Sequence, residues 1–269
     1  MRANDLPDPK VSMWAWMGVH LRFMREQKGM SQSAVAKLLT CGIASISRIE
    51  NNQEHLDEKE AMILDEVWRT GDLFLTMHWY ASKGHDPNWH SQHLSIEAVA
   101  LAIRTFQGLT IPGLLQIPEY ARALALSMGS PNIDAMVEER MARRVVLLRD
   151  PSPVMWAIVP EHVLDTPVGG PEVMRKQLAY LLEITENPNV GLRVIARRSG
   201  AHAGVDGSFK VMTMPGGDVA YTESPGGGRL VPSASEVRGL LLRYDRISNR
   251  ALDEDQSRVL VGEIMEAMT

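Results

Sequence analysis

Residues 29–54 constrain the fold of this chain more than any other stretch, because their spacing predicts two short helices joined by a tight bend. Gly29 can adopt the left-handed backbone that ends a helix, and Ser31 then stands where an N-cap residue belongs. The apolar residues of the next helix share one face, namely Val35, Leu38 and Leu39. After a short break, Ile46 and Ile49 form the apolar face of a second helix. The two helices can therefore cross steeply with these faces in contact.

The flanking residues predict a five-helix bundle over residues 16–80. Residues 16–28 are amphipathic, and Asp57 and Glu60 have the spacing of a capping box that opens a further helix. A last short helix is expected over about residues 73–80. The bend alone would also suit an ordinary helical hairpin, but the surrounding helices favour a helix-turn-helix unit. In such a unit, the exposed side chains at the start of the second helix meet base edges in the major groove.

Residues 16–80 resemble the lambda-repressor-like, XRE-type DNA-binding domain. The hallmark run of hydrophobic-Ser-Arg-hydrophobic-Glu is present here as residues 46–50. The resemblance implies that Gln32 contacts the DNA backbone and that Asn51 lies near a phosphate. The full set of residues predicted to bind double-stranded DNA is Gln32, Ser33, Gly42, Ile43, Ala44, Ser47, Arg48 and Asn51.

The same resemblance implies a structural ion pair between Glu50 and Arg25 of the first helix. Electrostatics supports that role, because a carboxylate aimed at DNA phosphates would be repelled. The chain departs from the family pattern at Thr40, which stands where the turn usually contains glycine.

The residues predicted to face the groove are less polar than is common in this family. Ile43 and Ala44 fill positions where members often carry polar base readers such as Gln. Apolar groups can contact thymine methyls but offer no bidentate hydrogen bond. Arg48 is therefore the best candidate for a guanine contact. We expect either modest specificity or a reliance on DNA shape.

Charge and bulk composition predict that the protein binds nonspecific DNA only weakly. The chain carries a net charge of −5, and within residues 16–80 the basic residues concentrate in the first three predicted helices. Few phosphates can then be neutralised, and a homodimer on two half-sites would double the contacts. The only cysteine, Cys41, excludes an internal disulfide framework. The polar first ten residues and the lack of a long apolar run predict a cytoplasmic protein with no membrane span.

Changes in composition along the chain predict two domains of different class. Residues 1–15 are interpreted as an N-terminal extension and residues 16–80 as the all-α helix-turn-helix bundle. Residues 81–94 are polar, contain Gly and Pro, and are typical of a linker. Residues 95–269 mix helical and strand periodicity, which predicts an α+β domain with a small, mostly antiparallel sheet.

Within this larger domain, residues 95–106 follow a helix-like apolar pattern. The segments with strand patterns are residues 154–159, 191–196, 208–214 and 219–223. Two helices are expected to close the chain, over about residues 233–248 and 253–268. Gly and Pro between the later strands suggest hairpins.

A second signature lies in residues 111–122, which read Ile-Pro-Gly-Leu-Leu-Gln-Ile-Pro-Glu-Tyr-Ala-Arg. This phrase resembles the C-terminal domain of a large group of actinobacterial regulators, often called WhiJ-like or antitoxin-like. In that group an XRE-type domain precedes a domain of uncharacterised function. The resemblance implies transcriptional control, often beside a small partner protein encoded nearby, and supplies no known ligand.

Other residues invite alternative chemistry that their spacing does not support. The histidines at 78, 85, 90 and 93 match no standard zinc-finger spacing. Ser199, His202 and Asp206 are close in sequence, but no nucleophile elbow accompanies them. Residues 226–229 lack the ending of a phosphate-binding loop and suit a hairpin loop better. We therefore expect no metal, no cofactor and no enzymatic activity.

The arginines at 140, 143, 144 and 149 leave two interpretations open. They form either a solvated helix face or a surface for an acidic partner.

The leading hypothesis is a homodimeric, sequence-specific transcriptional regulator. Its C-terminal domain would dimerise and receive a signal, either a partner protein or an unknown small molecule. The alternative is an antitoxin-like protein that mainly sequesters a small partner encoded nearby.

Overall fold

The computed structural model describes residues 7–83, 89–224, 228–231 and 233–268. The chain divides into two compact units, with the boundary after Trp89. Helix α5 ends at Lys83 and helix α6 begins at Trp89, so both ends of the predicted linker 81–94 are helical. The first helix begins at Met13, inside the predicted extension 1–15.

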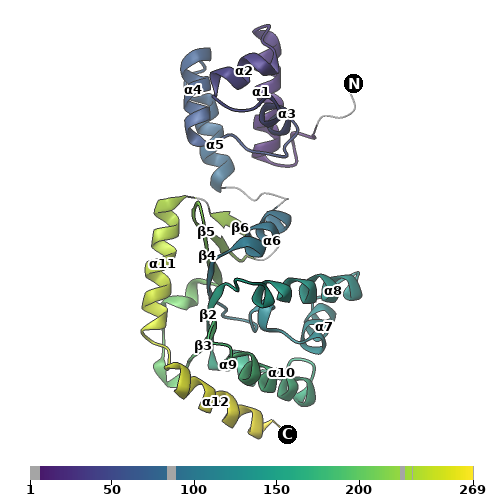
Figure 1. Cartoon of the computed structure of the whole chain (residues 1–269), viewed down its shortest axis with the longest axis vertical. Coiled ribbons are helices and arrows are strands. Elements are labelled where there is room, and N and C mark those ends of the chain that lie inside the picture. Colours follow the sequence, from purple (N-terminus) through teal and green to yellow (C-terminus); the bar gives the residue numbers. More distant parts are fainter. Residues whose placement is uncertain (1–6, 84–88, 225–227, 232, 269) are drawn as a thin grey trace. The chain divides into compact units, whose positions relative to one another are not determined.

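The first unit contains five helices between residues 7 and 83, as the sequence predicts (Figure 1). They are α1 (Met13–Gln27), α2 (Gln32–Leu38), α3 (Ile43–Glu50), α4 (Glu58–Trp68) and α5 (Leu73–Lys83). One apolar core joins them, with Leu21, Ile46, Leu64 and Phe74 fully buried. The core is thus made where the helical periodicity places apolar residues on facing sides.

Side-chain caps fix where these helices begin. The hydroxyl of Ser31 accepts the N–H of Ala34 at 3.1 Å at the start of α2. Asp57 accepts the N–H of Glu60 at 2.7 Å, and the Glu60 carboxylate accepts the N–H of Asp57 at 2.9 Å. The predicted capping box is therefore present, and it satisfies two N–H groups that would otherwise lack partners.

The turn between α2 and α3 forms without the usual glycine. Thr40 adopts the left-handed backbone with φ 56°. The N–H of Cys41 donates to the carbonyl of Ala36 at 2.9 Å, which closes the end of α2. A β-branched residue pays a conformational cost at positive φ.

The second unit is built on a sheet of six described strands in the order β3-β2-β1-β4-β5-β6. They are β1 (Ala102–Phe106), β2 (Val154–Pro160), β3 (Val190–Ile195), β4 (Phe209–Met214), β5 (Gly217–Thr222) and β6 (Arg229–Val231). Strand β2 is parallel to both β1 and β3, whereas the pairs β1–β4, β4–β5 and β5–β6 are antiparallel. The sheet is mixed, so the prediction of a mostly antiparallel sheet is wrong.

One source of the error is the central strand β1. Residues 102–106 were expected to continue a helix from residue 95, but α6 (Trp89–Val99) ends earlier. Ile103 and Thr105 point to one face and are fully buried, and Arg104 points to the other. A short run with this alternation, rich in β-branched and aromatic residues, is typical of a strand. Strand β6 was missed as well, because residues 226–229 were expected to form a loop; residues 226 and 227 lie outside the described part.

Parallel pairing requires crossover connections, and helices supply them. Strands β1 and β2 are linked through α7 (Pro118–Ser127) and α8 (Ile133–Arg143). Strands β2 and β3 are linked through α9 (Glu161–Asp165) and α10 (Pro171–Ile184). Figure 1 shows α6 to α10 on one side of the sheet and α11 (Ala234–Ser248) on the other.

The last helix, α12 (Glu254–Ala267), covers the edge strand β3. The N–H of Val194 donates to the hydroxyl of Ser257 at 2.9 Å, and the N–H of Leu252 donates to the carbonyl of Val194 at 2.8 Å. These bonds occupy backbone groups that would otherwise invite pairing with another chain.

The signature segment at residues 111–122 is held in place by the side-chain amides of two buried residues, Gln116 and Gln177. Gln116 donates to the carbonyl of Ile111 at 2.6 Å and accepts from Arg140 at 2.8 Å. Gln177 on α10 accepts the N–H of Ile117 and donates to the carbonyl of Leu115, both at 2.8 Å. These contacts give hydrogen-bond partners to backbone groups that have none within a helix or strand. The phrase thus has a structural role.

A buried charged cluster lies between the helical layer and the sheet. Glu97 on α6 is 1% exposed and accepts from Arg143 at 2.8 and 3.1 Å, and it also pairs with Lys210 on β4. His93 lies 3.5 Å from the Glu97 carboxylate, with its ring stacked on Tyr221. Burial alone would raise the pKa of Glu97, but the cations and the hydrogen bond from His93 hold it well below its usual value. Burial, followed by the charge of Lys210, lowers the pKa of His93 to about 4.

Gly18 lets the backbone of α1 lie close to the backbone of α3. A Cβ atom there would lie 2.3 Å from the carbonyl oxygen of Ile49, which is backbone and cannot move aside. We expect Gly18→Ala to lower the free energy of unfolding by about 1–3 kcal/mol through overpacking. Urea denaturation would measure the loss. Gly239→Ala is the control, because a Cβ at this helical position meets nothing within 4 Å; it should leave stability equal or slightly higher. A Gly18→Ala protein as stable as the parent would contradict the predicted close approach.

The His93 environment predicts a stability loss in mild acid. Its pKa falls from the ordinary 6.5 to about 4 in the folded protein, so the unfolded chain binds the proton more readily between these values. Stability should fall by about 3 kcal/mol as the pH drops from 6.5 to 4. Glu97 adds a separate loss below its ordinary pKa of 4.5, because its folded pKa is depressed. In His93→Phe, which keeps an aromatic ring beside Tyr221, the loss between pH 6.5 and 4.5 should shrink. Parallel denaturation curves for both proteins would disprove the assignment.

Candidate nucleic-acid interface

Helix α3 has two faces of opposite character. Ser45, Ile46, Ile49 and Glu50 are buried against the rest of the first unit. The opposite face carries the residues predicted to meet the groove: Ile43 is 54% exposed, Ala44 and Arg48 are exposed, and Ser47 is half-buried. The helix therefore presents a small, mixed apolar and basic surface outward.

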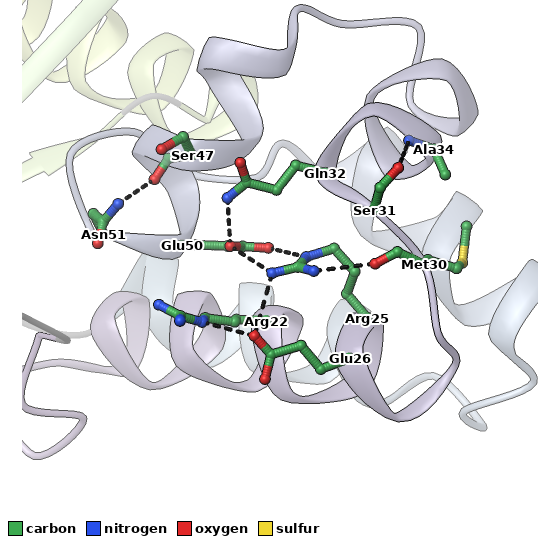
Figure 2. A network of polar contacts seen from close by, with 10 residues as sticks. All are labelled: Arg22, Arg25, Glu26, Met30, Ser31, Gln32, Ala34, Ser47, Glu50 and Asn51. Carbon is green, nitrogen blue, oxygen red and sulfur yellow. Dashed lines mark hydrogen bonds and ion pairs between the residues drawn. The ribbon is translucent and has the colours of Figure 1, made fainter. Parts of the chain in front are cut away.

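The buried carboxylate of Glu50 holds the two crossing helices to α1 (Figure 2). Arg25 Nε donates to Glu50 Oε1 at 2.5 Å and Arg25 Nη2 donates to Glu50 Oε2 at 3.1 Å. The hydrogen bond with Glu50 raises the pKa of Arg25. The ion pair implied by the family resemblance thus exists as a bidentate pair, the strongest arrangement of these two groups.

Gln32 adds the third helix to this contact. Its amide Nε2 donates to Glu50 Oε2 at 2.8 Å, and Figure 2 shows the side chain directed at that carboxylate. Arg25 also donates to the carbonyl of Met30 at 3.1 Å, in the segment before α2. An amide has a second hydrogen on the same nitrogen. Gln32 is half-buried, and only one N–H of its amide is used in the bond to Glu50.

Arg48 is engaged by a residue that the sequence analysis did not single out. Its Nε donates to Glu54 Oε2 at 2.7 Å, and the hydroxyl of Ser45 donates to Glu54 Oε1 at 2.5 Å. The hydrogen bond from Ser45, followed by that from Arg48, lowers the pKa of Glu54. A DNA base or phosphate must therefore compete with this carboxylate for Arg48. The sequence offered one sign, because Glu54 is an acidic residue only four positions after the hallmark run.

The remaining predicted residues lie at the ends of α2 and α3. Gly42 is the N-cap of α3 and supplies no side-chain cap, so the N–H groups of Ile43 and Ala44 at the start of the helix have no capping side chain. Asn51 donates from Nδ2 to the carbonyl of Ser47 at 2.7 Å and ends α3 (Figure 2). Ser33 is half-buried in α2.

No catalytic or metal constellation forms among the described residues. No group of three or more His, Cys, Asp or Glu could hold an ion in that part of the chain, while His85 and the side chain of His90 lie outside it. Ser199, His202 and Asp206 bond elsewhere: Ser199 donates to Arg250, His202 accepts from Gly204, and Asp206 pairs with Arg243. Cys41 is a free, half-buried thiol whose pKa is raised by burial.

The arginine group at residues 140–149 is neither a solvated face nor an open basic surface. Arg140 bonds Gln116 and Arg143 pairs with the buried Glu97. Arg144 lies 4.5 Å from the ring centroid of Tyr180, and Arg149 donates to two backbone carbonyls before β1. Each guanidinium therefore serves the packing of the second unit.

Over the described residues, no helix is both long and apolar enough to cross a bilayer.

Comparison with protein families identifies both units. Residues 16–70 match the family model described as "Helix-turn-helix domain", which agrees with the geometry of α1 to α4. Residues 91–263 match the model described as "Domain of unknown function (DUF5753)". No curated protein and no solved structure matches the chain.

The burial of the Arg25–Glu50 pair predicts that its loss lowers the stability of the first unit strongly. Arg25→Ala would leave a buried carboxylate unpaired and should cost about 3–5 kcal/mol of unfolding free energy. The control is Arg22→Ala, since Arg22 pairs with Glu26 at 3.0 Å on the surface of the same helix. That change should cost less than about 0.5 kcal/mol. Urea denaturation of both variants measures the difference, and equal losses would refute the structural role of Glu50.

Proposed function

We propose that this chain, which belongs to the family defined by the domain of unknown function DUF5753, is a sequence-specific transcription regulator. The helix-turn-helix domain supports DNA binding. The observation that carries the proposal is the division of α3 into a buried face held by Glu50 and an exposed face with Ile43, Ala44 and Arg48. A helix held rigidly from behind can place its outer side chains in a groove.

We propose that α3 enters the major groove of double-stranded DNA. Arg48 would contact a guanine, and Ile43 and Ala44 would lie against thymine methyl groups. The first-turn N–H groups after Gly42, together with Gln32, Ser33 and Asn51, would meet phosphates. Ser47 is short enough to allow close approach beside Arg48. Such an interface reads few bases directly, so DNA shape would contribute to recognition.

We propose further that the protein acts in the cytoplasm as a homodimer on two half-sites. The net charge of −5 limits the attraction of one copy to DNA, and a second copy would double the contacts. The DUF5753 unit would then dimerise and receive a signal. The phrase at residues 111–122 supports a relationship to the WhiJ-like actinobacterial regulators, in which an XRE-type domain precedes such a unit.

An antitoxin-like role, in which the chain sequesters a small partner protein, is a second candidate. One feature favours it: an open cavity of about 320 Å³ lies beside α8 and α10, lined in part by Val145, Leu148 and Tyr180. Val145 is 62% and Leu148 is 75% exposed. Exposed apolar side chains beside a hollow are typical of protein contact surfaces. Co-purification with the product of a neighbouring gene would support this role, and a stable homodimer without a partner would count against it.

DNA selection with the full chain, followed by binding measurements on the selected site, tests the leading proposal. Arg48→Ala should weaken the selected site by about 1–3 kcal/mol, which is tenfold or more, because a guanine contact is lost. Circular dichroism should be unchanged, since Arg48 is exposed. Lys59→Ala removes the same charge from the exposed surface of α4 and should change affinity little. Failure to select any site at low salt with a folded protein would end the proposal, and equal effects of the two variants would refute the assigned role of Arg48.

A further inference from the structure

A cavity of about 310 Å³ opens on the α11 side of the sheet in the second unit. Strands β1, β2 and β3 form its floor, and α11 and the start of α12 form its walls. The residues that matter for its chemistry are Arg104, Trp156, Gly191, Arg193, Tyr244 and Glu254. A hollow of this size suits a small ligand.

The floor of the cavity is one row of the sheet, in which two large side chains lie beside a glycine. Arg104 pairs in register with Trp156, and Trp156 pairs with Gly191, so the three lie side by side on one face. A Cβ atom at Gly191 would come within 2.5 Å of the Glu254 carboxylate and 3.3 Å of the Trp156 ring. Any larger residue at Gly191 would therefore fill part of the floor.

Arg104 is a half-buried cation without a carboxylate partner among the described residues. Its guanidinium lies 4.8 Å from the ring centroid of Trp156, which is a cation–π contact. A guanidinium stacked in this way keeps its N–H edge available for a carboxylate. A partly buried charge with no counterion costs free energy, and a bound anion would offset that cost.

The guanidinium of Arg193, also in the cavity lining, adds positive potential, although its own N–H groups are already hydrogen-bonded. Arg193 donates to Leu252 O at 2.7 Å, to Ala251 O at 3.0 Å and to Ser248 Oγ at 2.5 Å. These acceptors are neutral, so the charge of Arg193 is fixed in position but not cancelled by an ion pair. The lining has one acidic group, Glu254, whose carboxylate lies against Gly191 and offsets only one of the two guanidinium charges. The lining therefore has a net positive charge, which attracts anions.

The aromatic side chains give the cavity an apolar part. Tyr244 on α11 is buried and donates its hydroxyl to the carbonyl of Trp156 at 3.2 Å, which fixes both residues. The ring of Trp156 remains 37% exposed. A ligand with only a charge would leave the ring of Trp156 in water, whereas a planar apolar body would cover it.

We propose that this cavity binds a small organic carboxylate with a planar, apolar body. The N–H edge of Arg104 holds the carboxylate, and the body lies beside the rings of Trp156 and Tyr244. The inference gives a ligand class to the sensing role proposed for the DUF5753 unit. Binding can be measured without DNA, so its failure and the failure of DNA recognition are distinguishable.

Fluorescence titration of the full chain with benzoate tests the proposal. Trp156 is the only tryptophan after residue 89, and its fluorescence should change on binding. Benzamide, which has the same shape without the charge, should bind much more weakly. Inorganic phosphate should not compete at equal concentration, because it has no body to cover the rings. Trp156→Phe should abolish the signal.

Two matched variants separate the Arg104 contact from general charge. Arg104→Gln should weaken benzoate binding by about tenfold or more, because a charge-assisted hydrogen bond is lost. Arg238→Gln removes an exposed arginine of α11 outside the cavity and should leave binding unchanged. If Arg104→Gln does not fold, as judged by circular dichroism, the comparison of benzoate with benzamide on the parent protein decides. Equal binding of these two compounds, unaltered binding by Arg104→Gln, or no binding of benzoate at millimolar concentration would overturn the proposal.

Discussion

The first unit depends on a single buried carboxylate, that of Glu50. A buried charge is tolerated only when its hydrogen-bonding capacity is met, and here Arg25 and Gln32 meet it from two other helices. The crossing of α2 over α3 and their seat on α1 therefore share one electrostatic contact. Gly18 adds the steric condition, because it lets the backbone of α3 come close to α1. Together these features set the angle at which the exposed face of α3 is offered to a partner.

The second unit repeats the same solution with different elements. The buried Glu97 joins α6 to α8 through Arg143 and to the sheet through Lys210. On that side of the sheet the polar groups satisfy one another, and the side-chain amide of Gln116 does the same for the signature phrase. On the opposite side, Arg104 and Arg193 have no carboxylate partner among the described residues. The contrast between a satisfied and an unsatisfied set of charges is what distinguishes a structural cluster from a candidate ligand site.

The proposed DNA-binding surface includes an acidic residue, Glu54, that opposes binding to DNA. Glu54 holds Arg48 in place and also brings a negative charge close to where phosphates would lie. In the proposed interface such a residue would weaken attraction to any DNA, while a correctly placed guanine would compete with it for Arg48. Low net attraction and few base contacts are consistent with a regulator that needs two copies on two half-sites, as proposed.

Local pattern in the sequence by itself determined the five-helix bundle, the capping box at Asp57 and the faces of α3, because periodicity and capping act within a few residues. It also determined four strands and the two closing helices to within a few residues. The tertiary structure alone decided the mixed sheet: β1 is short, and its pairing with β2 and β4 depends on residues more than forty positions away. The same holds for Gly18 against Ile49 and for the meeting of Arg104, Trp156 and Gly191 in one row. Pairing between distant segments leaves no period in the sequence, so only the folded chain could reveal these contacts.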